Sequence, residues 1–508
     1  MYIGMNYFTT KTVTRISPMK TAIVIGAGLG GLCTALRLTQ KGYTVKIIEK
    51  NSTLGGRLNI LQDKGYSFDV GPSFYSMSYE FDELFNSIGI KNPLQIEKLE
   101  PIYQVYFRNR KTPFKIYTDI DKLAQEFAFE SNFREKIEKY LEKAAQFFHD
   151  TEKTIVKKNF NSIPHYLLGM TKVPLKHIPY LFQSMWKVLD KTFDHEETKI
   201  IFSLVAFFLG STPFETPSIY ALLNYTELKH DGYWAVKGGM YSIVREIEKI
   251  LKQRGVEFIT NTEIVDYENG KPNKISAFID QNGKKYAADI FVVNSDAAAF
   301  RGKVLKKAKY EESKLDRLDW TLSPFTIYLG VRKKLKNLIH HNYFLGDNFK
   351  EYASKIFKST IAPEKPYYYV NVTSKSDPTT APEGCENVFI LCPVPDLRYK
   401  KDWNDTESFA LNIIQDLQER IEDNILDYID TMHVMNPIDW QNKFNLYKGS
   451  GLGLSHGMLQ VGGFRPKNYD EDYKNVFYVG ASTTPGTGLP MVVISSKLVT
   501  ERIEKANL

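Results

Sequence analysis

The stretch that decides the fold is TAIVIGAGLGGLCTALRLTQKGYTVKIIEK, residues 21–50. Its first apolar run, 22–25, is typical of a buried strand and stops at the glycine-rich turn 26–31. A helical pattern follows and ends at Gly42, and a second apolar run ends at Glu49. This order of strand, glycine turn, helix, strand and acid predicts an α/β unit that binds a dinucleotide.

Each glycine of the turn has a separate expected role. Gly26 makes the tight turn, Gly28 lets the backbone approach a pyrophosphate, and Gly31 permits close contact between helix and strand. The helix N-terminus favours an anion, because its N–H groups are unpaired and its dipole end is positive. Glu49 can accept a hydrogen bond from a ribose 2′-OH, and its charge disfavours a 2′-phosphate.

The composition is that of an ordinary multidomain protein. A chain of 508 residues exceeds one core, which predicts two or three domains. No apolar run reaches the ~18 residues that a membrane span needs. The net charge of +7 is scattered, which argues against a nucleic-acid partner. The three cysteines lack metal-ligand spacing, so we expect no metal site and a reducing, cytoplasmic location. Residues 1–18 lack the apolar core of a signal peptide and are expected to form an extension outside the fold.

Later segments of the sequence are also expected to lie near the nucleotide. Gly55-Gly56-Arg57 follows the acid closely, and Arg57 can offer fixed cationic donors to a phosphate or a carbonyl-rich ring. Lys237-Gly238-Gly239-Met240 precedes a helical pattern that ends at Gly255. We expect strands at 256–260, near Ile264, and at 275–280 and 286–293, the last two joined by the turn Asn282-Gly283. A central nucleotide-binding sheet is therefore assembled from separated parts of the chain.

The middle of the chain predicts a helical insertion and a substrate domain. Between Ser131 and Lys158 apolar side chains recur on one helical face. Between Thr151 and Asp190, six lysines and two acidic residues mingle with aromatic side chains. This mixture suits a membrane surface, and it equally fits helices packed on their own domain. Residues 307–443 mix strand and helix signals with prolines and are assigned to the substrate domain.

The C-terminal stretch NVFYVGASTTPGTGLPMVVISSKLVTERI, residues 475–503, distinguishes the candidate cofactors. It predicts a strand, a glycine-rich turn and a helix that begins near Leu489. A helix N-terminus placed against a flavin stabilises negative charge at its N1–C2=O edge during reduction. An NAD domain needs no such returning segment, whereas the large, two-ended cofactor FAD can use one.

Together these motifs resemble the phytoene-desaturase family of FAD-dependent carotenoid desaturases and isomerases, over most of residues 21–502. The segments that carry the resemblance are the turn 26–31 with Glu49, Gly55-Gly56-Arg57, Asp69-Val70-Gly71-Pro72-Ser73, Lys237-Gly238-Gly239-Met240 and, above all, 480–490. The sequence departs from the family pattern at Thr484, where His is common, and at Met491, where Gly is frequent.

The resemblance implies the fold of the flavin amine oxidases, α/β (α+β overall). A Rossmann-like FAD-binding domain, discontinuous in sequence, is joined by a mixed substrate domain and a helical insertion. The implied boundaries are 1–18 for the extension, 19–100, 234–306 and 444–508 for the FAD-binding parts, 101–233 for a mainly helical, membrane-facing region, and 307–443 for the substrate domain. The implied cofactor residues are Gly26, Gly28, Gly31, Glu49, Gly56 and Arg57 for the ADP and phosphates, Ile264 near the adenine, and Gly480, Gly488, Leu489 and Pro490 along the flavin.

The implied activity is desaturation of a C40 polyene that enters an apolar tunnel from the membrane, with the protein bound peripherally. Hydride leaves a carbon beside the conjugated chain, which delocalises the charge, so no catalytic base is assigned. His340, His341 and His456 are candidates for proton handling. The departures at Thr484 and Met491 favour a 1-hydroxycarotenoid 3,4-desaturase. The alternatives are a phytoene desaturase, a carotenoid cis–trans isomerase or saturase, an amine oxidase, and a non-catalytic carotenoid-binding protein. The electron acceptor is expected to be a quinone or oxygen.

Overall fold

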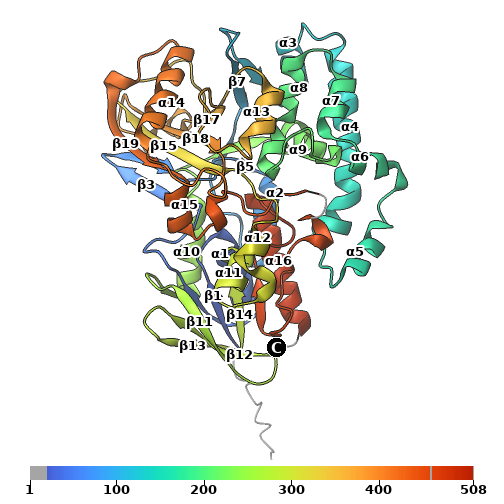
Figure 1. Ribbon diagram of the computed structural model, residues 1–508, viewed down its shortest axis with the longest axis vertical. Coiled ribbons are helices and arrows are strands. Elements are labelled where there is room, and N and C mark those ends of the chain that lie inside the picture. The colour runs from blue at the N-terminus through green and yellow to red at the C-terminus, as the bar shows by residue number, and fades with distance from the viewer. Residues whose placement is uncertain (1–19, 458–459, 507–508) are drawn as a thin grey trace, which may run out of the picture.

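A five-stranded parallel sheet lies at the base of the molecule in the computed structural model, which describes residues 20–457 and 460–506 (Figure 1). The strand order is β10-β2-β1-β14-β20. The bounds are Thr21–Ile25 for β1, Thr44–Ile48 for β2, Glu257–Ile259 for β10, Ile290–Val293 for β14 and Val476–Tyr478 for β20. The prediction that separated parts of the chain build this sheet is confirmed. The expected extension, 1–18, lies outside the described residues.

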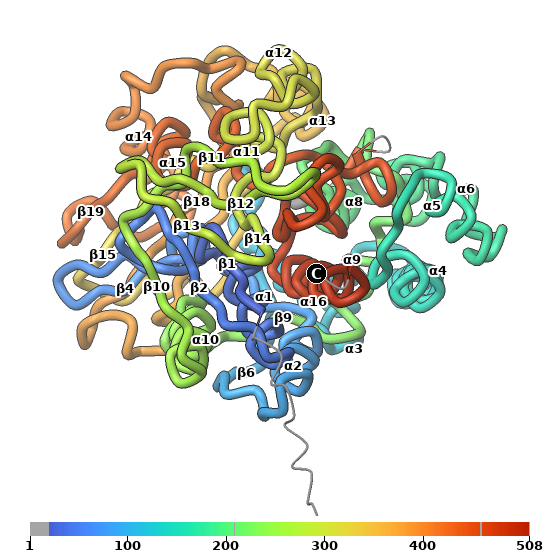
Figure 2. The backbone as a smooth tube through the Cα atoms, turned by 90° about the horizontal axis from the view of Figure 1, so that it is seen from below, coloured from blue at the N-terminus to red at the C-terminus, as the bar shows by residue number. Residues whose placement is uncertain are grey.

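Both faces of this sheet are covered, because alternate residues of a strand point to opposite sides. Val24 of β1 packs with the helical side, whereas Ile23 and Ile25 pack on the other side. The helices are α1 (Leu29–Gln40), α2 (Ser78–Ser87), α10 (Ser242–Gln253) and α16 (Leu489–Ala506). The other face carries β11 (Ile264–Asn269), β12 (Ile275–Asp280), β13 (Lys285–Ala287) and α11 (Ala297–Lys303). Helices α1 and α16, from opposite ends of the chain, lie side by side (Figure 2).

The expected strand 286–293 is in fact two strands in two different sheets. β13 pairs with β12, and β14 pairs with β1 in the parallel sheet. Asp289 lies between them, and its carboxylate accepts hydrogen bonds from the Thr21 N–H and hydroxyl at 2.7 and 2.8 Å. Asp289 therefore holds the first residues of β1 and β14 next to each other.

A seven-stranded mixed sheet forms the second half of the molecule, in the order β19-β15-β18-β17-β16-β7-β8. The bounds are Tyr103–Phe107 (β7), Phe114–Ile116 (β8), Ser323–Val331 (β15), His341–Leu345 (β16), Tyr368–Asn371 (β17), Glu386–Val394 (β18) and Ile429–Met435 (β19). Helices α12 (Glu312–Leu315), α13 (Phe349–Ile356), α14 (Thr406–Arg420) and α15 (Pro437–Phe444) belong to the same stretch of chain. The region 101–233, expected to be mainly helical, thus contributes two strands. The run Tyr103-Gln104-Val105-Tyr106-Phe107 is buried throughout, and its aromatic and β-branched residues suit a strand.

Helices α3 to α9 gather on the right of Figure 1, beside the sheets. Their bounds are Ile120–Glu126 (α3), Phe133–Thr151 (α4), Ile163–Met170 (α5), Ile178–Phe182 (α6), Met185–Thr192 (α7), Glu196–Ser203 (α8) and Leu222–Tyr225 (α9). Short strands join the two halves: β3 (Ile60–Asp63) with β4 (Tyr66–Asp69), and β5 (Tyr75–Ser76) and β6 (Ile96–Lys98) with β9 (Tyr233–Val236). The helical face expected between Ser131 and Lys158 is α4, which buries Phe133, Ile137, Tyr140, Leu141, Ala144, Phe147 and Phe148.

Candidate cofactor and substrate site

The glycine turn has the geometry that its sequence predicts. Gly26 has a φ of +96°, a conformation that side chains rarely adopt. A Cβ on Gly31 would lie 2.3 Å from the Gly26 carbonyl oxygen, so only glycine lets α1 approach β1 this closely. Gly28 is the N-cap of α1, which has no side-chain cap and no acidic residue in its first turn. The open N-terminus of α1 lines the cavity described below and suits a phosphate.

Glu49 lies at the end of β2 on the same side. Its side chain is buried, and its two carboxylate oxygens accept hydrogen bonds from the N–H groups of Ala27 and Asn51 at 2.7 and 2.9 Å. Burial raises its pKa, which these hydrogen bonds partly oppose. Each oxygen keeps a lone pair for a ribose hydroxyl. Ile264 also lines this end of the cavity, at the start of β11, and packs with Ile48 beside Glu49.

Arg57 links the nucleotide motifs to a distant segment. Gly55 forms a parallel bridge to Gly28, which holds Gly56 and Arg57 at the cavity wall. The Arg57 guanidinium donates to the Gly451 carbonyl at 2.6 Å. Burial lowers the pKa of Arg57, and the negative charge of Asp296 opposes this. Arg57 thus offers a partly buried positive charge at the cavity wall.

Asn294 and Asp296 are site residues that the sequence reasoning missed. They follow β14, so they lie at the same edge of the sheet as the glycine turn and Glu49. The Asn294 amide donates to the Gly26 carbonyl at 3.2 Å, and Asp296 accepts a hydrogen bond from the Ser482 hydroxyl at 2.9 Å. The signal was present, since Asn-Ser-Asp directly follows an apolar strand and caps a helix.

The C-terminal turn lies next to this edge. Gly480 and Gly488 have φ values of +107° and +105°, and Leu489 and Pro490 begin α16 as expected. Gly480, Gly488, Leu489 and Pro490 all line the cavity, as do the departures Thr484 and Met491. The structure therefore brings together ten of the eleven predicted cofactor residues along one cavity, and Gly31 supports the turn from behind.

Arg465, a second missed residue, holds the C-terminal turn in place. Its guanidinium is buried and donates to five backbone carbonyls at 2.7–3.2 Å, those of Leu454, Ser455, Gln460, Ala481 and Thr483. Burial lowers its pKa to about 10, against the opposing charges of Tyr220 and Asp296. One side chain thus joins the 454–460 segment to the turn after β20.

His456 lies in the same segment, and both of its ring nitrogens contact the backbone. One ring nitrogen contacts the Leu209 carbonyl at 3.3 Å, and the other accepts the Thr487 N–H at 3.2 Å. Burial keeps its pKa well below the ordinary value, so the ring is neutral with both nitrogens in use. This geometry favours a structural role over proton handling.

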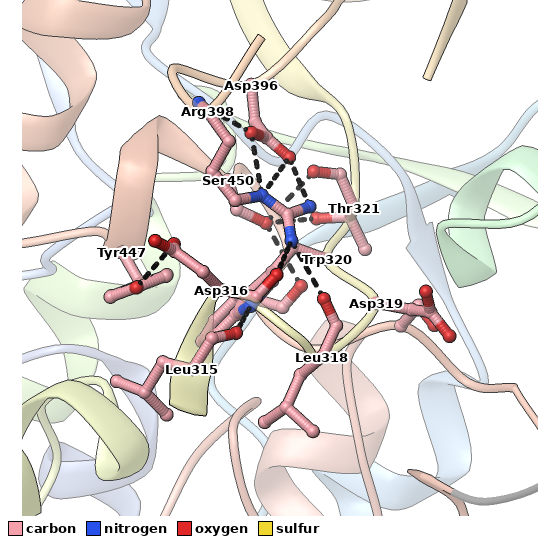
Figure 3. Close-up of polar contacts among 12 residues, drawn as sticks. Leu315, Asp316, Leu318, Asp319, Trp320, Thr321, Asp396, Arg398, Tyr447 and Ser450 are labelled. Carbon is pink, nitrogen blue, oxygen red and sulfur yellow. Dashed lines mark hydrogen bonds and ion pairs between the residues drawn. The ribbon is translucent and has the colours of Figure 1, made fainter. Parts of the chain in front are cut away.

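Polar contacts connect residues 315–321 and 396–398 with one another and with Tyr447 and Ser450, as in the hydrogen bond from the Tyr447 hydroxyl to Asp316 (Figure 3). Arg398 forms a bidentate pair with Asp396 and donates to the carbonyls of Asp316 and Leu318. The hydroxyls of Thr321 and Ser450 lie 2.8 Å apart. These contacts fix the stretch that presents the Gly451 carbonyl to Arg57.

One cavity of about 1700 Å³ runs from the nucleotide motifs into the second half of the molecule. Beyond the C-terminal turn its walls are mostly aromatic and aliphatic. The lining there includes Phe74, Phe147, Phe148, Phe160, Tyr166, Leu167, Met170, Leu181, Phe207, Leu223, Tyr343 and Tyr369. The cavity thus has a polar, glycine-rich end and a long apolar end.

Glu227 interrupts the apolar walls. It lines the cavity at 3% exposure, and its carboxylate accepts hydrogen bonds from the hydroxyls of Tyr103 and Tyr233 at 2.6 and 3.1 Å. Burial raises the pKa of Glu227 to about 7, against the two hydrogen bonds. No sequence pattern singles out this acid.

His340 and His341 do not line the cavity. His340 contacts the Ser376 hydroxyl at 2.8 Å, and burial lowers its pKa to about 4. His341 contacts the Tyr369 hydroxyl at 2.5 Å and stacks on Phe74, which does line the cavity. Proton exchange of either ring with a substrate would therefore have to pass through other side chains.

The residues at the polar end fit FAD. A Cβ on Gly28 would lie 2.7 Å from the Asn294 amide, and one on Gly56 would lie 3.2 Å from Gly28, so the glycines keep a narrow passage open. An uncapped helix N-terminus, a buried acid and a partly buried arginine line it. The second helix N-terminus, that of α16, faces the far end of this passage and suits the flavin ring.

Comparisons with known proteins agree with this geometry. The family of flavin containing amine oxidoreductases matches residues 29–503. A phytoene desaturase of Fusarium fujikuroi is 31% identical over 96% of this chain and 89% of its own length. A 1-hydroxycarotenoid 3,4-desaturase of a Flavobacterium species is 29% identical over 96% of this chain and 100% of its own. An oxidoreductase structure from Methanosarcina mazei superposes with a TM-score of 0.64 at 18% identity, covering 95% of this chain and 100% of that one.

The fold and the site define an FAD-dependent oxidoreductase. The chain belongs to the flavin-containing amine oxidoreductase family, within its group of carotenoid desaturases.

Proposed function

We propose that this protein introduces C=C bonds into a C40 carotenoid by hydride transfer to FAD. The observation that carries the proposal is the single cavity that joins the nucleotide motifs to a long apolar wall. A small amine would not need an apolar cavity of about 1700 Å³, whereas a C40 polyene is large enough to occupy it. The names of the similar proteins, which include phytoene desaturase and 1-hydroxycarotenoid 3,4-desaturase, support the same substrate class.

The roles of the chain's own residues follow from their positions. Gly26, Gly28, Gly56, Glu49 and Arg57 would hold the ADP and phosphates. FAD bound there supplies the hydride acceptor. Arg465 would keep the turn 480–488 in place against the flavin, and the aromatic walls would exclude water and position the polyene.

For the particular step, we propose a late desaturation of the 1-hydroxycarotenoid 3,4-desaturase type. Thr484 and Met491 line the cavity, so they can alter the fit of the substrate against the flavin. Phytoene desaturation and cis–trans isomerisation are the competing reactions. The test supplies FAD and purified protein with phytoene or with a 1-hydroxylated carotenoid in membranes. A product that absorbs at longer wavelength from the hydroxylated substrate alone supports the proposal, and conversion of phytoene alone contradicts it.

Exposed apolar side chains on α5, on α6 and on the short 3-10 helix between them support a proposal of peripheral membrane binding. Leu167, Leu168, Leu175, Ile178 and Phe182 are between 45% and 77% exposed. We call these five residues the apolar patch. Lys172 and Lys176 lie within the same stretch, a combination that suits an anionic bilayer surface. Among the described residues, no helix is long and apolar enough to cross a membrane.

The apolar patch also adjoins the cavity. Leu167 is 52% exposed and lines the cavity, as do its neighbours Tyr166 and Met170. A polyene could therefore pass from lipid to the cavity without crossing water. Flotation with liposomes tests the contact: protein that stays at the bottom with anionic lipid contradicts it. The electron acceptor is proposed to be a quinone or oxygen, and anaerobic turnover with added quinone distinguishes the two.

A further inference from the structure

A carboxylate is an unexpected group in the wall of a hydrocarbon channel. Removing a charge from water costs several kcal/mol unless partners replace the lost hydration, as a general estimate. Glu227 has two such partners, the hydroxyls of Tyr103 and Tyr233, one on each oxygen. A carboxylate can accept about four hydrogen bonds. A pure hydrocarbon packed against Glu227 would leave the remaining acceptor sites without donors.

The surroundings of Glu227 combine elements from both halves of the molecule. Tyr233 belongs to β9, and Tyr103 belongs to β7 of the seven-stranded sheet. Phe74 lies 4.9 Å from the Tyr233 ring and 4.3 Å from the His341 ring, between centroids. This places Glu227 and His341 in one aromatic cluster.

His341 supplies a hydrogen-bond donor in the same cluster. Its Nδ1 faces the hydroxyl of Tyr369 and the amide group of Asn371, which is a donor. Ser73 donates to the Tyr369 hydroxyl, which leaves the Tyr369 proton for His341. The neutral ring then carries its own proton on Nε2, an atom that is buried and has no hydrogen-bond partner among the described residues. The cluster thus holds an acceptor with spare capacity and an unused donor.

We propose that Glu227, held by Tyr103 and Tyr233, is the specificity-determining residue of a polar subsite that binds a hydroxyl group on the polyene. The proposal rests on the proposed function and assigns the residue that recognises the hydroxyl group of its substrate. A hydroxyl donates to the open acceptor sites of Glu227, and a hydrocarbon cannot. Because losing a hydrogen bond to a buried charged group is costly, the preference should be roughly ten- to a hundredfold in Kd.

The test measures binding without turnover. The FAD-loaded protein is reduced anaerobically, so that it cannot accept hydride, and titrated with a C40 polyene and with the same polyene bearing one hydroxyl. Quenching of protein fluorescence gives both Kd values. Wild type should bind the hydroxylated polyene at least ~10 times more tightly. In Glu227→Leu this preference should disappear, and in Glu227→Gln, which keeps the shape, it should fall to a few-fold.

The matched control is Glu80→Gln, which changes a buried acid that contacts Lys157 and does not line the cavity. It should keep the preference of wild type. Equal affinities in wild type, or an unchanged preference in both Glu227 variants, would overturn the proposal. An equal loss of turnover on all polyenes with unchanged preference would instead identify Glu227 as a proton acceptor and also overturn it. If the oxidised enzyme desaturates neither polyene, the proposed function fails, which is a separate result.

Discussion

The two ends of the cavity are built in opposite ways. At the polar end, short glycine-rich segments present backbone N–H groups, and each segment lies where its sequence motif predicts it. At the apolar end, bulky side chains from β9, β16, β17, β18 and the helices between α4 and α9 meet, and their neighbours in sequence do not reveal which of them face the cavity. The residues expected to bind the cofactor can thus be recognised in short sequence segments, whereas the residues that line the substrate end are brought together only by the tertiary structure.

The contrast is tested most strongly at Arg465, where the polar end depends on one distant side chain. Arg465→Met removes a donor from five buried carbonyls, of which that of Ser455 keeps the Gln460 amide, so we expect a loss of about 4 kcal/mol in the free energy of unfolding and weaker FAD binding. Urea unfolding and FAD titration measure the two effects. Arg465→Lys keeps the charge and three donors and should retain part of both. An FAD affinity like that of wild type in the Met variant would contradict this role.

Gly31 tests whether the local motif is as rigid as its geometry indicates. In Gly31→Ala the new Cβ meets a backbone oxygen at 2.3 Å, which cannot move without shifting β1. We expect a loss of about 3 kcal/mol in stability and loss of bound FAD. The control is Gly457→Ala, whose Cβ would lie 3.8 Å from the Ser455 hydroxyl oxygen, the one atom within 4 Å among the described residues. A Gly31 variant that still purifies yellow with full FAD would refute the argument.

The titration of Glu227 should make the stability of the apolar end depend on pH. The folded-state pKa of Glu227, about 7, exceeds its ordinary value of 4.5, so the native state binds more protons than the unfolded chain between these values. Stability contributed by the protonated carboxyl is therefore lost as pH rises from about 4.5 to about 7. Relative to wild type, Glu227→Gln should gain up to roughly 3 kcal/mol over this interval and no more above it. Melting curves between pH 4.5 and 8 measure this, and parallel curves for the two proteins would contradict it.

The apolar patch should show the smallest effect on stability. Leu168 and Phe182 are 66% and 74% exposed, so replacing both with Ser should change the free energy of unfolding by less than about 0.5 kcal/mol each. Liposome flotation, in contrast, should fall markedly. Leu411→Ser alters an exposed leucine on α14, at 48% exposure and outside the apolar patch, and is the control. Unchanged flotation in the double variant would remove the patch from the membrane proposal.

Much of the fold and the polar end could be predicted because turns and strand ends carry local signals. The glycines of 26–31, Glu49 and Leu489 lie where their motifs indicated. Asn294 follows a strand in the same way as Glu49, but it was not predicted as a site residue because it belongs to none of the motifs.

The residues that line the apolar end could not be predicted from the sequence, for a physical reason. Glu227 sits among helix-forming residues, and only the packing of β7 and β9 gives it buried tyrosine partners. The division of 286–293 into two strands likewise depends on Asp289 finding Thr21, 268 residues away in sequence. Contacts of this range leave no periodic trace in a single sequence.

The position of β20 and α16 has a consequence for biosynthesis. The ribosome releases the glycine turn early, yet the strand and helix that complete the cofactor site come from residues 476–506. Until those residues emerge, β14 has an unpaired edge and α1 lacks the helix that packs beside it. Stable capture of FAD therefore has to wait for nearly the whole chain, and a nascent polypeptide arrested before residue 476 should remain colourless.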